Sequence, residues 1–208
     1  MMSDQSSMHA YLNWTKQRID EMDAILASLE AKVGQVKVDS KADADRIVAD
    51  LRKRRDEFEA AAKAQAKAGQ AAVRENTAKL ESQWRRFETE VNTYFETVGK
   101  QAEQQKATFL QAAAAQAKAW RDTAEVFHNE AGKAVTARRA DIDAAVIKMK
   151  AGAAEAEARL HKLNQAGGES WAALSAALAE SRQAFDRANQ KAGDALKGGA
   201  QTKSNSST

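Results

Sequence analysis

The stretch ESQWRRFETEVNTYFETVGK, residues 81–100, decides the fold. It holds four of the twelve aromatic side chains in a chain of 208 residues. Trp84, Phe87, Val91 and Tyr94 follow one another at spacings of three and four, continuous with Leu80 before them. This spacing places them on one face of an α-helix. The stretch therefore predicts a helix whose aromatic face forms a packing seam rather than a ligand site.

Large side chains also return every eleven residues outside this stretch. Eleven residues fill three helical turns, so such a pattern keeps one face apolar along a nearly straight helix. A stripe of heptad type precedes it near the N-terminus. Together these patterns predict a packing or interaction seam made of Leu12, Ile19, Met22, Leu26, Leu29, Ile47, Leu51, Phe58, Leu80, Trp84, Phe87, Val91, Phe109, Trp120, Leu163, Trp171, Leu174, Leu178 and Phe185.

The composition predicts an all-α fold. The chain contains no proline and only ten glycines, and it is dominated by strong helix formers. This profile is typical of long helices and coiled coils. An unbroken helix from residue 40 to 196 would exceed about 200 Å in length. We therefore expect long amphipathic helices that form an antiparallel coiled-coil hairpin or a three-to-four-helix bundle.

Glycine and polar clusters suggest where the chain turns. We expect a flexible N-terminus over residues 1–7, one helical domain over 8–196 and a disordered tail over 197–208, where apolar residues are lacking. The best-signalled turn follows Gly34, near residues 34–40. Further candidate turns lie near residues 99–105, 128–133 and 164–170.

The sequence offers no catalytic or cofactor-binding motif. The chain has no cysteine, no glycine-rich phosphate loop and no Gly-x-Ser-x-Gly motif. A Glu-x-x-His spacing of the kind used in di-iron bundles occurs at Glu125–His128. It occurs once, whereas those sites need two such motifs, and the neighbouring Phe127 fits the seam better. We expect a non-enzymatic protein with no metal and no cofactor.

Basic residues near the aromatics are candidates for contact with an anion. Net charge is only +3, and acidic residues are interspersed with basic ones, which is typical of a solvated helix surface. Two short basic runs stand out, RKRRDEF at residues 52–58 and WRRF at residues 84–87. The residues that could contact phosphate are Arg52, Arg54, Arg55, Arg85 and Arg86.

The sequence also favours a particular location. The longest uncharged apolar stretch covers residues 107–117 and is too short to span a bilayer, which takes about twenty residues. The N-terminal sequence lacks the basic and apolar regions of a secretory signal. We therefore expect no transmembrane segment and a cytoplasmic protein.

Two segments carry a resemblance to known proteins. GGESWAALSAALAESRQAFDRA, residues 167–188, resembles the end of small, uncharacterised bacterial coiled-coil proteins, and ESQWRRFETEVNTYF, residues 81–95, is similar to a second copy of that unit. The eleven-residue amphipathic periodicity also resembles that of phasins and apolipoproteins, which coat polyester or lipid surfaces. The first resemblance implies a fold only, and the second implies a reversible surface coat.

Three functional hypotheses follow. The first is a coiled-coil scaffold or partner-binding protein that acts through its helical faces, either as a homo-oligomer or with a helical protein partner. The second is a phasin- or apolipoprotein-like coat on a lipid or polymer surface, with Trp and Phe as interfacial anchors. The third, which we rank last, is association with nucleic acid through the basic runs.

Overall fold

The computed structural model describes residues 2–133, 136–166 and 170–197, and these residues form six α-helices. The helices are α1 (Met2–Val33), α2 (Val38–Ala68), α3 (Gln70–Thr97), α4 (Ala102–Lys133), α5 (Thr136–Ala166) and α6 (Trp171–Lys197). The all-α bundle predicted from the sequence is confirmed. The number of helices exceeds the three or four expected, and the coiled-coil hairpin stays a prediction.

The additional helix break lies at Gly69, where the sequence suggested no turn. Gly69 adopts φ 93° and ψ −174°, and its N–H donates to the carbonyls of Gln65 and Ala66. This backbone region is essentially restricted to glycine. Because a lone glycine costs a helix only about 1 kcal/mol, its presence in a helical pattern did not mark a break.

The other predicted boundaries differ in accuracy. The α1–α2 connection lies at residues 34–37 and the α3–α4 connection at residues 98–101, in or beside the regions expected to turn. The turn predicted near 128–133 is placed too early, because these residues form the last part of α4, which ends at Lys133. Of the turn predicted at 164–170, residues 164–166 belong to α5, and 167–169 lie outside the described residues. Helix α1 begins at Met2, inside the segment expected to be flexible, and residues 198–208 of the predicted tail also lie outside the described residues.

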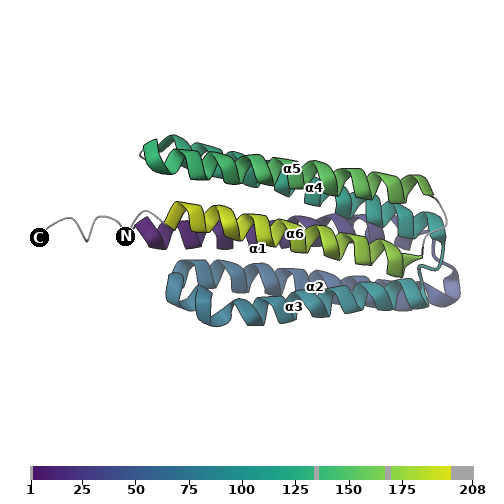
Figure 1. The fold of residues 1–208 in the computed structure, drawn as a ribbon. Helices are drawn as coiled ribbons and strands as arrows, with labels where there is room; N and C mark the ends of the chain where they lie inside the picture. The colour runs from purple at the N-terminus through teal and green to yellow at the C-terminus, as the bar shows by residue number, and fades with distance from the viewer. Residues whose placement is uncertain (1, 134–135, 167–169, 198–208) are drawn as a thin grey trace, which may run out of the picture.

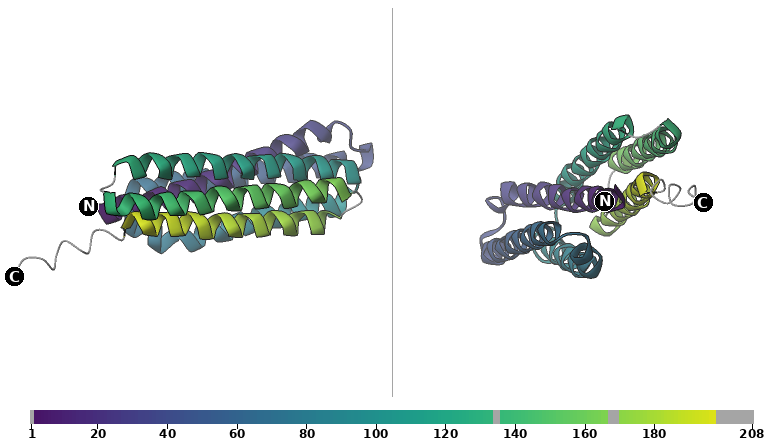
Figure 2. Two further views of the ribbon diagram at one scale, coloured as in Figure 1. Left: turned by 45° about the horizontal axis from the view of Figure 1, so that its top comes forward. Right: turned by 90° about the vertical axis from the view of Figure 1, so that its left-hand side faces the viewer.

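The helices form three layers of antiparallel pairs (Figure 1). Helices α4 and α5 form one outer layer, α1 and α6 the middle layer, and α2 and α3 the other outer layer. The view along the helices shows the two outer pairs on opposite sides of the middle pair (Figure 2). Helix α1 contacts α2, α4 and α6, which makes it the central helix of the molecule.

This arrangement amounts to two four-helix bundles that share α1 and α6. In the first quartet, α1, α4, α5 and α6, each helix packs against the next and the ring is closed. In the second quartet, α1, α2, α3 and α6, the contacts run from α6 to α1, α2 and α3, but the backbones of α3 and α6 come close at few positions and only side chains bridge them. The second quartet is therefore open along its α3–α6 edge.

Two hydrophobic clusters fill the interior. The larger one joins α1, α2 and α3 to the first half of α4 and the start of α6, and it includes most of the aromatic side chains. The smaller one lies between the second half of α4, α5 and the second half of α6. It is built around Trp120, Phe127 and Phe185, and alanines supply much of the remainder.

Candidate functional site

The aromatic cluster of residues 81–100 lies inside the protein. Trp84, Phe87, Tyr94 and Phe95 are all buried. The ring of Phe95 packs 4.2 Å from the ring of Trp171 on α6, and Tyr94 packs edge-on against Phe95. The phenol of Tyr94 accepts a hydrogen bond of 2.8 Å from Gln104 at the start of α4. These side chains hold α3 against the ends of its neighbours, as expected of a packing seam.

Most of the predicted seam is buried. The buried members are Met22, Leu26, Leu29, Ile47, Leu51, Phe58, Leu80, Trp84, Phe87, Val91, Phe109, Trp120, Trp171, Leu174, Leu178 and Phe185. Ile19 is half-buried and packs against the larger cluster. Leu163 belongs to α5, and its side chain lies outside the described part of the structure.

Leu12 is a wrong assignment, because its side chain is 44% exposed. It lies on an exposed stripe of α1 together with Lys16, Asp23 and Glu30. A heptad seam allows one buried stripe per helix, whereas α1 is covered by helices on several sides. Tyr11 and Trp14 are buried in place of Leu12, and the Tyr11 hydroxyl donates to the carbonyl of Ala62.

The predicted anion-contact residues are mostly engaged within the protein. Arg52 pairs with Glu30 on α1, Arg54 with Glu90 on α3, and Arg85 with Glu81 on its own helix. Arg55 makes two hydrogen bonds to Asp23 of α1, of 2.6 and 3.0 Å, and a further one to Glu59. The bonds to Asp23 raise the pKa of Arg55 further above its ordinary value. Arg86 is exposed. The basic run on α2 therefore ties this helix to α1 and α3.

The described residues form neither a metal site nor a membrane-spanning helix. These residues contain no group of three or more histidine or acidic side chains arranged to hold a metal ion. Glu125 and His128 are both exposed, and Phe127 between them is fully buried, as its fit to the seam predicted. None of the helices in the described residues has an apolar segment long enough to cross a membrane.

A network of buried charged and amide side chains lies in the middle of the bundle. Its centre is Glu21 of α1, which is completely buried. The Glu21 carboxylate accepts hydrogen bonds from Gln17 on the same helix at 2.8 Å and from Gln116 of α4 at 3.1 Å. Arg182 of α6, itself 6% exposed, forms an ion pair with Glu21. Burial of a carboxylate is tolerated only when it is paired and hydrogen-bonded in this way.

A second arginine extends the network. Arg18 of α1 binds Asp186 of α6 through two parallel hydrogen bonds of 2.7 Å each, and it also donates to the side chain of Gln17. Such bidentate pairs are among the stronger hydrogen-bonded interactions in proteins. The guanidinium groups of Arg18 and Arg182 lie 5.8 and 4.8 Å from the centre of the Trp84 ring. Two cations thus share the electron-rich ring of one tryptophan.

Glu88 of α3 reaches across the open edge to the same Arg182. Burial raises the pKa of Glu88, and the nearby negative charge of Glu21 raises it further. The positive charges of Arg182 and Arg18 and a hydrogen bond from Trp84 lower the pKa but do not cancel the rise. Arg182 therefore forms ion pairs with two carboxylates, that of Glu21, which is fully buried, and that of Glu88, which is about a third exposed. This ion pair is a main link between α3 and α6.

A groove runs along the open α3–α6 edge on both sides of that link. One part, with a cavity volume of about 370 Å³, is lined by Trp84, Phe87, Trp171 and Ala176 among others. The other part, of about 700 Å³, is lined by Tyr11, Trp14, Val73, Asp186, Arg187 and Lys191 among others. Helix α1 contributes residues to both parts, so it forms the floor between walls supplied by α3 and α6.

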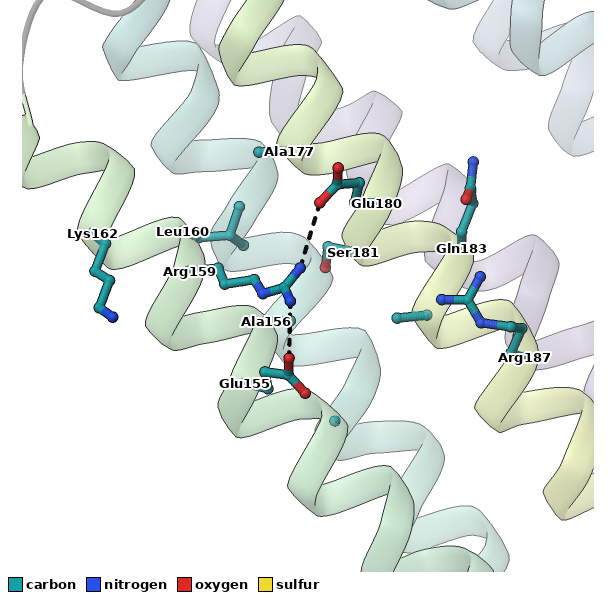
Figure 3. Close-up of a pocket in the computed structure, with 12 residues that line it drawn as sticks. Glu155, Ala156, Arg159, Leu160, Lys162, Ala177, Glu180, Ser181, Gln183 and Arg187 are labelled. Carbon is teal, nitrogen blue, oxygen red and sulfur yellow. Dashed lines mark hydrogen bonds and ion pairs between the residues drawn. The ribbon is translucent and has the colours of Figure 1, made fainter.

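A further groove of about 680 Å³ lies between α5 and α6 (Figure 3). Arg159 in its centre is paired with Glu155 at 3.1 Å and with Glu180 at 3.5 Å. Its apolar lining consists of small side chains such as Ala156 and Ala177, with Leu160 beside them. It lacks the aromatic floor and the buried charge network of the α3–α6 groove, so we take the latter as the candidate functional site.

Sequence reasoning missed the charge network completely. Nothing in the sequence singles out Glu21, Arg182 or Glu88, because isolated charges in helical sequences normally lie on solvated surfaces. The three residues come from α1, α6 and α3, and Glu21 and Arg182 are 161 positions apart. Polar residues at Gln17 and Glu21, within a stripe that continues as Met22, Ile25 and Leu26, were the available signal.

The fold and the site define a six-helix all-α bundle, counted over the described residues, with one open helix edge and a charge network beneath it. Comparisons with protein-family models, curated proteins and solved structures found no match to this chain.

Proposed function

We propose that this protein is a non-enzymatic binding protein that holds a helical segment of a partner protein in the groove between α3 and α6. The observation that carries the proposal is the open edge of the second quartet. Helices α1, α3 and α6 present a floor and two walls. A helix laid over the rims of the walls, above the contacts that Phe95 and Glu88 make with α6, would cover the edge that no helix of the described residues covers. Amphipathic helices bind hydrophobic grooves of this kind in many complexes.

The composition of the groove supports the proposal. Trp14, Trp84 and Trp171 line it, and arginine lies beside them at residues 18 and 182. Tryptophan and arginine are enriched among the residues that dominate binding energy at protein interfaces. The titratable groups nearest the aromatic floor, Glu21 and Glu88, are occupied by Arg182, which favours binding over catalysis.

The surface-coat hypothesis has weaker support. A coat would require the bundle to open and lay its inner faces on lipid or polymer. The inner face of α1 carries Gln17, Arg18 and Glu21 in its central part, and all three are buried in the closed protein. Placing these groups against a hydrocarbon surface would be costly. A coat predicts a blue shift of tryptophan fluorescence with vesicles, whereas a groove-binding protein predicts no change.

Site-directed photo-crosslinking in the cell of origin tests the proposal. A photoreactive amino acid would replace Thr89 on α3 or Ala176 on α6, which are exposed side chains that line the groove. The matched control is Lys148, an exposed residue on α5. We expect both groove positions, and not Lys148, to capture the same protein through a segment with helical periodicity.

Three other outcomes would contradict the proposal. Capture of a second copy of this chain at both groove positions, with a dimer in sedimentation, would replace partner binding with self-association. Crosslinking to lipid or polymer would favour the coat. Equal capture at all three positions would show that the groove has no special role.

A further inference from the structure

The two parts of the α3–α6 groove differ in chemistry, and this difference restricts what can occupy them. Glu88 and Arg182 pair across the edge between the two parts. The part beside Trp84 and Trp171 has small side chains on its α6 wall, among them Ala172 and Ala176. The cavity between these rings and the small residues, of about 370 Å³, has room for a large apolar side chain from outside.

The other part carries uncompensated positive charge. Of its two carboxylates, Asp186 is paired with Arg18, and Glu81 is paired with Arg85. Its cations are Arg187 and Lys191 of α6, and neither takes part in any ion pair found in the described residues. Arg187 stands at the crest of α6, where it also borders the groove between α5 and α6 (Figure 3). The two cations are four positions apart and therefore neighbours on one face of α6. The charge available to a ligand here is positive.

We infer that the helix bound in this groove places a large apolar side chain against Trp84 and Trp171 and a carboxylate edge against Arg187 and Lys191. This inference rests on the proposed function and specifies the chemistry of the partner. Ala176 precedes Arg187 by eleven residues and Lys191 by fifteen, which is roughly 17–23 Å along a helix. The partner segment should therefore carry aspartate or glutamate about eleven to fifteen residues from a leucine, phenylalanine or tryptophan.

Two synthetic helical peptides of about twenty residues test the inference with the full-length protein. Both carry the same apolar face and the same anchor, and they differ only in having glutamate or lysine along the edge that faces α6. Binding is followed by fluorine NMR of the protein labelled with 5-fluorotryptophan, which keeps all four tryptophans. Trp84 lines the groove, whereas Trp120 packs against Phe185 in the smaller hydrophobic cluster. We expect the glutamate peptide to shift the Trp84 resonance and to leave the Trp120 resonance unchanged.

The charge of the α6 wall is then reversed. We expect the glutamate peptide to bind the unmodified wall about threefold to tenfold more tightly than the lysine peptide, with the difference shrinking at high salt. Arg187→Glu with Lys191→Glu should invert this preference. The matched control, Lys148→Glu with Lys150→Glu on exposed positions of α5, should leave it unchanged. Circular dichroism confirms that each variant is folded.

The outcomes separate this inference from the proposed function. If neither peptide binds, the groove does not accept a helix, and the proposed function fails together with the inference. If both peptides bind with equal affinity and charge reversal changes nothing, helix binding in the groove stands and the acidic edge is wrong. A preference for the lysine peptide would also overturn the inference alone.

Discussion

At the scale of single residues, the protein depends on a few buried polar side chains in an otherwise alanine- and leucine-rich interior. Glu21 is completely buried. Its carboxylate is paired with Arg182 and accepts hydrogen bonds from two glutamine side chains. Replacing a buried ion pair by apolar groups is often tolerated, but removing one partner leaves an uncompensated charge. The same residues therefore offer a direct test of the network.

Arg182→Met should destabilise the protein by about 3–5 kcal/mol, because it would leave Glu21 in the interior without its ion-pair partner. The double variant Arg182→Met with Glu21→Gln should recover part of this loss. Urea unfolding at pH 7 measures both. Arg159→Met on the α5 surface serves as the control and should cost no more than about 1 kcal/mol. An equal loss of unfolding free energy in the Arg182 and Arg159 variants would show that the Arg182 ion pairs contribute no more than ion pairs on the surface.

Glu88 should make stability depend on pH in the opposite sense to an ordinary paired carboxylate. Because burial raises its pKa in the folded protein, the folded state holds the Glu88 proton more tightly than the unfolded state does. Stability is therefore gained as pH falls through the folded-state pKa and is lost as pH rises through it. Relative to Glu88→Gln, the unmodified protein should gain unfolding free energy as the pH falls from 7 toward 4.5, the ordinary pKa of a glutamate. A difference that is constant over this range would contradict the raised pKa.

At the scale of elements, the length of each helix is set by local backbone chemistry as much as by the apolar seam. Helices α2 and α3 are joined through Gly69 alone, and its positive φ reverses the chain within one residue. Gly132 lies in the last turn of α4, where it is exposed and where an added Cβ would meet no atom within 4 Å. The two glycines therefore have opposite structural roles.

Gly69→Ala should destabilise the protein by about 1–3 kcal/mol, because alanine cannot adopt the backbone conformation at this position without strain. A Cβ at Gly69 would meet no atom within 4 Å, so the loss comes from the backbone and not from a clash. Gly132→Ala should stabilise the protein by about 0.5–1 kcal/mol, because alanine is the better helix former. Thermal unfolding of both variants distinguishes the two effects, and a stabilising Gly69→Ala would show that α2 continues into α3.

At the scale of the whole molecule, two four-helix bundles share their central pair, but they are not equally well packed. The cluster around α1, α2 and α3 contains most of the large side chains. The cluster between α4, α5 and α6 relies on Trp120, Phe127, Phe185 and Met149 and on many alanines. Because alanine buries little apolar surface, the second cluster stabilises its helices less.

We therefore expect α5 to open at a lower free energy than α1. Helix α5 lies at the outside of the thinner cluster and contacts α4 and α6, whereas α1 contacts four helices, α2, α3, α4 and α6. Hydrogen exchange measured by mass spectrometry should show that amides of residues 141–160 exchange faster than those of residues 18–29 under native conditions. Equal protection of the two segments would indicate that the molecule opens only as one unit.

The fold class and the buried aromatic positions were predictable from the sequence. The spacing of Leu80, Trp84, Phe87 and Val91 identifies a buried helical face, and these four side chains are buried. Leu12 was misassigned because a pattern of threes and fours cannot show how many neighbours a helix will have. The arginines of residues 52–55 were read as a surface run, because their partners on α1 and α3 lie far away in the sequence.

The sequence by itself determined that this chain forms long helices and which large side chains leave water, because helix propensity and apolar periodicity depend on residues within a few turns of each other. Only the tertiary structure decided which polar side chains are buried and which helix edge stays open. Those features depend on residues such as Glu21 and Arg182, which are 161 positions apart and meet only when α6 folds back against α1. A pairing of this kind leaves no pattern along the chain, since each partner taken alone has the sequence surroundings of a solvated charge.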